Sequence, residues 1–165
     1  MADFEDKLSR LLDSLDERER EADRARQDER AATEAFIEGF ERKRLDVIVP
    51  VFQELGRALK ARGHDYYIRE SPHSRAADGR SAPASVSLEI YLKGMPEWRD
   101  LDTPHLEYIT QEHTRSIVVH VSSIDRSGSV GSLDREPLSL EQITPDAVRQ
   151  RFLALFTQLV ENRPE

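Results

Sequence analysis

The fold is decided by residues 85–93, which read SVSLEIYLK. Apolar and polar side chains alternate along this stretch, and a period of two residues is that of a β-strand. The apolar set is Val86, Leu88, Ile90 and Leu92. The polar set is Ser85, Ser87, Glu89, Tyr91 and Lys93. This pattern predicts an antiparallel strand with one face buried against a core and the opposite face in water.

Further strands are predicted on both sides of residues 85–93, because similar alternation recurs with turn residues between the segments. These strands are expected at 64–70, 105–111, 115–123 and, shorter, around 130–135. The connection 71–84 is rich in Ser, Pro, Gly and Ala and is expected to be a long loop. Since no βαβ alternation is visible, the segments favour an antiparallel meander of four to five strands over a doubly wound nucleotide fold.

Helical periodicity precedes the predicted strands. The apolar stripe there comprises Phe36, Ile37, Phe40, Leu45, Ile48, Phe52, Leu55 and Leu59. Pro50 interrupts this stripe, so the helix is expected either to kink or to restart with Pro50 in its first turn. Lys60, Arg62 and Gly63 follow the stripe and are typical of a helix end.

A helix is also predicted after the strands. Its start is marked by Thr144-Pro145-Asp146, which supplies a capping hydroxyl, a proline in the first position and an acid in the first turn. Its apolar face is Val148, Phe152, Leu155, Phe156 and Leu159. These elements predict an α+β fold, in which a long N-terminal coiled-coil-like helix precedes a two-layer domain of antiparallel sheet covered by helices.

Residues 1–35 are expected to form a separate charged helix, and residues 36–165 a head domain. Apolar residues recur in the helix at alternating spacings of four and three, the heptad pattern of a coiled-coil seam. The predicted self-association positions are Phe4, Leu8, Leu11, Leu15, Ala22, Ala25, Ala32 and Phe36. Between Asp16 and Arg30, however, 12 of 15 residues are charged. This centre is expected to pair weakly, or to stand as a solvated helix held by its own ion pairs.

Composition limits the functions that remain. The chain has no cysteine, which excludes disulfides, thiolate zinc sites and cysteine nucleophiles. Its formal net charge of −8 argues against bulk affinity for nucleic acid. No apolar stretch approaches the roughly 20 residues that span a bilayer, and the acidic N-terminus lacks a secretory signal. A cytoplasmic location without membrane contact is therefore expected.

No sequence motif predicts a catalytic or cofactor site. The five histidines, whose spacings match none of the compact metal-ligand patterns, are His64, His73, His105, His113 and His120. Two of them, His105 and His120, are expected on neighbouring strands with Glu107 nearby. We expect no cofactor, no metal and no enzymatic activity. A small ligand-binding or hydrolytic domain built on the strand histidines is retained as an alternative.

The sequence thus predicts an acidic adaptor, a homodimer or higher oligomer that presents an α+β head to a partner protein. Another alternative is an accessory subunit that contacts nucleic acid through local basic residues. The candidate contact residues for a partner or nucleic acid are Arg42, Lys43, Arg44, Arg57, Lys60, Arg62 and Trp98. Trp98 lies in a polar turn and is expected either to anchor a contact or to cap the core.

Overall fold

The structure is a computed structural model of the full chain. It describes residues 1–94, 103–124, 130–134 and 136–162, with the backbone alone for 123–124 and 130–134. The chain divides into two compact units, Met1–Ala35 and Phe36–Glu165.

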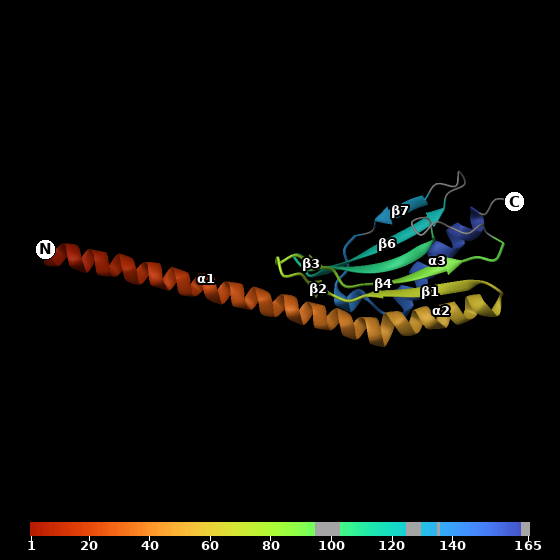
Figure 1. The fold of residues 1–165 in the computed structure, drawn as a ribbon, viewed down its shortest axis with the longest axis horizontal. Coiled ribbons are helices and arrows are strands. Elements are labelled where there is room, and N and C mark those ends of the chain that lie inside the picture. Colours follow the sequence, from red (N-terminus) through yellow and green to blue (C-terminus); the bar gives the residue numbers. More distant parts are fainter. Residues whose placement is uncertain (95–102, 125–129, 135, 163–165) are drawn as a thin grey trace. The chain divides into compact units, whose positions relative to one another are not determined.

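Helices begin and end the part of the chain that the structure describes (Figure 1). They are α1 (Ala2–Lys43), the π-helical turn η1 (Arg44–Ile48), α2 (Val49–Ala61), the 3-10 turn η2 (Leu140–Gln142) and α3 (Pro145–Glu161). None of the described helices is both long enough and apolar enough to cross a membrane.

The strands form the predicted antiparallel meander. Its five strands, in the order β1-β4-β5-β6-β7, are β1 (Asp65–Ser71), β4 (Ser85–Tyr91), β5 (His105–Gln111), β6 (Ser116–Ile124) and β7 (Val130–Asp134). The segment predicted as a loop, 71–84, instead contains a small antiparallel hairpin of β2 (Ser74–Arg75) and β3 (Ser81–Ala82). Its two-residue strands are too short for a period of two to be visible in the sequence.

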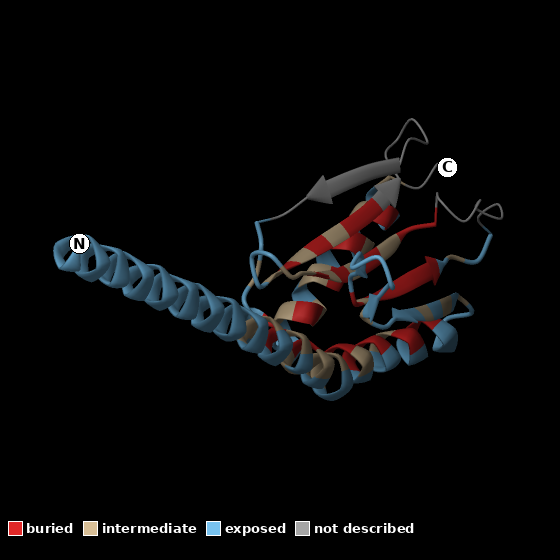
Figure 2. Cartoon of the chain, turned by 60° about the vertical axis from the view of Figure 1, so that its left-hand side comes forward, coloured by how far each residue is buried: buried red, intermediate tan, exposed pale blue. Residues whose placement is uncertain are grey.

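The core lies between the sheet and the helices α2 and α3, which contact it on one face. Val86, Leu88 and Ile90 of β4 point into this core and are fully buried, as predicted. Across the interface, the ring of Phe52 from α2 lies 6.3 Å from that of Tyr108 on β5. Figure 2 shows these buried positions in red on the strands and on the helices that face them. The α+β class predicted from the sequence is confirmed.

Local sequence signals explain where α3 begins and where α2 ends. Thr144 is the N-cap of α3, and its hydroxyl accepts a hydrogen bond from the backbone N–H of Ala147 at 3.2 Å. Pro145 occupies the first turn, where its missing N–H costs nothing. Gly63 follows the end of α2 with a φ of 83°, a conformation that favours glycine. Both predicted helix boundaries are confirmed.

The π turn η1 changes the predicted apolar stripe. Pro50 lies in the first turn of α2, which begins immediately after η1. Leu45, predicted to face the core, is 58% exposed. The wider π turn takes its side chains out of the 3.6-residue register, and Arg44 is half-buried instead. Its guanidinium pairs with Glu41 at 2.7 Å and with Glu70 of β1.

Candidate functional site

The first turns of α1 carry a row of large apolar side chains that lie in water. Phe4, Leu8, Leu11 and Leu15 are 68%, 44%, 68% and 52% exposed. Leu12, which the heptad analysis omitted, is 51% exposed and widens the row to the flanking position. We call these five residues the apolar seam. A helix that leaves five large apolar side chains in water is typical of one that binds a partner.

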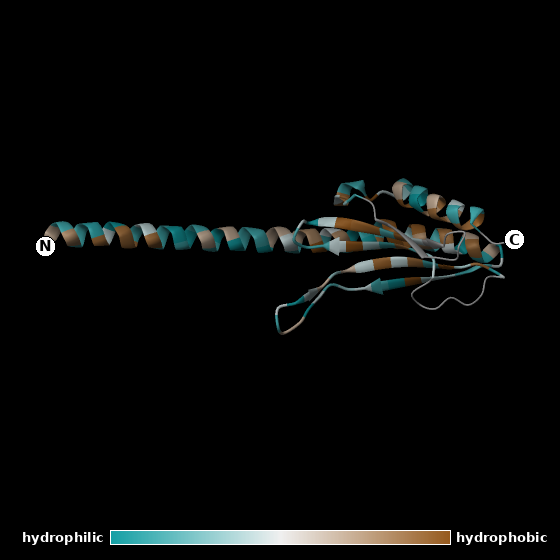
Figure 3. Ribbon diagram, turned by 90° about the horizontal axis from the view of Figure 1, so that it is seen from above, coloured by the Kyte–Doolittle hydropathy of each residue, from teal (hydrophilic) through white to brown (hydrophobic). Residues whose placement is uncertain are grey.

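The centre of α1 is solvated and held by its own charges. Glu17 pairs with Arg20 at 3.7 Å, and Asp23 with Arg26 at 3.1 Å. Exposed pairs of this kind contribute at most about 1 kcal/mol each. The predicted seam positions here are small, Ala22 and Ala25 being exposed and Ala32 half-buried. Figure 3 shows hydrophilic colour dominating α1. The centre therefore contributes helicity more than adhesive surface.

The last predicted seam position, Phe36, differs from the others. Its side chain is 6% exposed and belongs to the core of the second unit, together with Phe40 and Ile48. At Phe36 the heptad spacing of the seam and the broader stripe of the head overlap in sequence, and burial assigns the residue to the head. We leave Phe36 out of the apolar seam.

The predicted basic contact residues do not form one unopposed group. Lys43 donates a hydrogen bond to the backbone carbonyl of Ile143 at 3.2 Å. The hydrogen bond to Glu41, followed by that to Glu70, raises the pKa of Arg44. Lys60 lies 3.7 Å from the Asp65 carboxylate. The side chains of Arg42, Arg57 and Arg62 are exposed, and Trp98 lies outside the described residues.

The face of the sheet opposite α2 and α3, here called the open face, is less wet than the alternation of β4 predicted. Ser87 and Glu89 are buried, Glu89 to 9% exposure. β4 is an inner strand of the sheet, and long side chains from β1 and from β4 itself cover its polar residues. Arg69 of β1 pairs with the Glu89 carboxylate at 3.0 Å, and the Tyr91 hydroxyl donates to it at 2.9 Å. Burial, and then the bond to Glu89, raises the pKa of Tyr91.

The histidines divide into separate environments. The ring of His64 accepts a hydrogen bond from the backbone N–H of Lys93 at 3.0 Å, and His73 pairs with Glu112. His113 is exposed in the turn between β5 and β6. His105 and His120 do come together on the open face, on neighbouring strands as predicted.

Comparisons with known proteins do not add a family to this picture. No family model matches the chain, and neither the curated proteins nor the solved structures contain a significant match.

Proposed function

We propose that this protein is a non-enzymatic interaction module, which self-associates through α1 and presents its α+β head to a partner protein. The observation that carries the proposal is the apolar seam: Phe4, Leu8, Leu11, Leu12 and Leu15 lie exposed on one side of four successive turns. A second copy of the same helix offers a surface of matching shape and chemistry.

The free energy available from burying side chains favours pairing at the apolar seam over pairing along the whole helix. Removing a leucine or phenylalanine side chain from water stabilises by roughly 1.5–3 kcal/mol. The heptad positions Phe4, Leu8, Leu11 and Leu15 supply this gain from both copies. The same heptad spacing continues beyond Leu15 and places the charged residues Arg18 and Glu29 at positions that would face a partner helix. Charged residues at such positions are poor coiled-coil formers, so the interface is expected to be strongest in the first four turns.

The head offers its own candidate surface for a partner protein. Leu153 and Val160 of α3 are 52% and 58% exposed. They are seven positions apart, close to two helical turns, so they lie on the same side of the helix. This pair supports the second part of the proposal, since exposed apolar residues that share a helix face are typical of helix-mediated contacts.

Light scattering on the full chain tests self-association. We expect a mass of at least twice that of one chain at tens of micromolar, and a monomer for the double variant Leu8→Glu/Leu15→Glu. The matched control is Ser9→Glu/Gln27→Glu, which adds the same two charges at heptad positions away from the seam. Far-UV circular dichroism checks that the variants keep their helix. A monomeric unmodified chain, or equal dissociation in the control, would contradict the proposal.

A further inference from the structure

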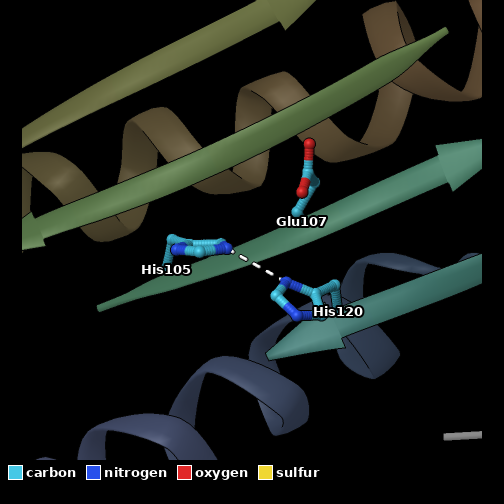
Figure 4. Close-up of side chains that lie close together, drawn as sticks. All are labelled: His105, Glu107 and His120. Carbon is cyan, nitrogen blue, oxygen red and sulfur yellow. Dashed lines mark hydrogen bonds between the residues drawn. The ribbon is translucent and has the colours of Figure 1, made fainter. Parts of the chain in front are cut away.

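Three potential metal ligands meet on the open face of the sheet. His105 and Glu107 lie two residues apart on β5, so their side chains point to the same side. His120 of β6 is the direct register partner of Glu107. Figure 4 shows the three side chains on one side of the strands, with the helices behind them. All three are half-buried, and one ligand atom from each lies within 4.8 Å of the others.

The spacing of the two imidazoles matches that of ligands on a single ion. His105 Nε2 and His120 Nδ1 are 3.1 Å apart. Metal–nitrogen bonds of about 2.0–2.1 Å at a tetrahedral angle place two nitrogens about 3.3 Å apart. The distance between the two nitrogens therefore already suits a shared cation, and each ring has to turn so that its lone pair points at the ion. The Glu107 carboxylate, on a flexible side chain, has to approach by rotation about its own bonds.

The orientation of His105 is fixed in the way that metal-binding histidines are usually fixed. Its Nδ1–H donates to the backbone carbonyl of Thr103 at 2.8 Å, and Thr103 is buried. The lone pair of Nε2 is thereby directed toward His120. Histidine ligands commonly donate their second ring N–H to a carbonyl or carboxylate, which sets the tautomer and the ring plane.

Without a cation, the same geometry is a hydrogen bond in which His120 Nδ1–H donates to His105 Nε2. A cation that binds both nitrogens needs the other tautomer of His120, in which the ring proton sits on Nε2, so that Nδ1 offers a lone pair and the imidazole stays neutral. Glu107 supplies negative charge on the same face, whereas the carboxylate of Glu89, opposite His105 in the register, is already paired with Arg69. Mixed nitrogen and oxygen donors, without thiolate, suit zinc and its first-row neighbours better than magnesium or calcium.

We propose that His105, Glu107 and His120 bind one divalent transition-metal ion, zinc being the best match. Two histidines and one glutamate leave a fourth tetrahedral position for water or for a ligand from outside the chain. The site is independent of self-association through α1, because all three ligands lie on two strands of the head.

Zinc binding to the untagged full chain, measured by equilibrium dialysis and by calorimetry, tests the site. We expect one zinc ion per chain, with affinity reduced at least about tenfold in each of His105→Asn, His120→Asn and Glu107→Gln. His113→Asn, which removes an exposed histidine from the adjoining turn, is the matched control and should keep full affinity.

Cobalt absorption gives a second readout that does not depend on affinity alone. Replacing zinc with Co²⁺ should produce visible bands typical of a four-coordinate site in the unmodified chain and in His113→Asn, and weaker or shifted bands in Glu107→Gln. Circular dichroism before metal addition identifies any variant that fails to fold, in which case the remaining two carry the test. Absence of stoichiometric zinc binding at about 100 μM metal, or an equal loss in His113→Asn, would overturn the proposal.

Discussion

The two faces of the five-stranded sheet are built from the same strands but differ in the interactions that their side chains make. On the helix-covered face, Val86, Leu88 and Ile90 lose all contact with water. On the open face, Arg69 and Glu89 are held by each other and by polar neighbours. The hydrophobic face therefore supplies stability, whereas the polar face is free to carry binding chemistry. Substitutions on the two faces should differ in size and in kind.

The largest difference is expected for matched apolar truncations. Leu88→Ala empties a fully buried site and should lower the free energy of unfolding by about 2–5 kcal/mol. Ile109→Ala removes a comparable side chain from the half-buried open face of β5 and should cost less than half as much. Urea denaturation of both variants measures the contrast. Equal losses would break the distinction between the faces.

Tyr108 lies on the helix-covered side of the sheet and is almost fully buried. Burial raises its pKa to about 12. An unfolded tyrosine ionises near pH 10, so between pH 10 and 12 the unfolded chain sheds a proton that the folded chain keeps. Stability should be fully present below pH 10 and fall on the order of 2–3 kcal/mol by pH 12.

Tyr108→Phe isolates that effect from every other alkaline titration. Its hydroxyl has no hydrogen-bond partner among the described residues, so at pH 8 the variant should be as stable as the parent or slightly more stable. Above pH 10 the parent should lose stability faster than the variant in parallel urea titrations. Identical pH profiles would show that this hydroxyl is not buried as described.

The next largest effect on stability is expected where the backbone of α2 packs closely against a side chain of β1. A Cβ added at Gly56 of α2 would lie 2.4 Å from the Tyr66 ring of β1. Gly56→Ala should therefore destabilise by about 1–3 kcal/mol through overpacking, despite the better helix propensity of alanine. Thermal unfolding compares it with Gly56→Ala/Tyr66→Ala, in which the clash is absent. If Gly56→Ala alone raises the melting temperature, the helix is not packed this closely on β1.

The smallest effect on folding is expected on the open face. His120→Asn, measured with a chelator present, should change the free energy of unfolding by less than about 1 kcal/mol, because the side chain is half-buried among polar groups. A loss of unfolding free energy as large as that of Leu88→Ala would mean that the histidine pair supports the fold. It would contradict the assignment of stability to the helix-covered face alone.

The buried residues of the helix-covered face could be predicted from the sequence. Alternation in residues 85–93 identified Val86, Leu88 and Ile90 as buried, and Thr144-Pro145-Asp146 identified the start of α3. These signals are local, since period and capping chemistry are set by residues a few positions apart. The apolar seam is equally local, and whether it pairs stays a prediction.

The open face was harder to predict because the burial and pairing of its side chains depend on residues of neighbouring strands. Burial of Glu89 requires Arg69 and Tyr91 around it, and Arg69 is twenty positions away on β1. The proximity of His105 and His120 was expected from adjacent strands, but their separation matches no compact ligand spacing. Only the strand register shows that Glu107 and His120 stand directly opposite one another.

The π turn η1 carries a consequence for how this chain tolerates insertions and deletions. Phe40 and Phe52 are twelve positions apart and both fully buried. In a continuous α-helix, at about 100° per residue, they would point about 120° apart. Eleven positions would leave only about 20° between them. One extra residue, absorbed between Arg44 and Ile48, thus keeps both phenylalanines in phase. Deleting one residue there would place Pro50 in the interior of a continuous α-helix, where it removes a backbone hydrogen bond, so the deletion should be poorly tolerated.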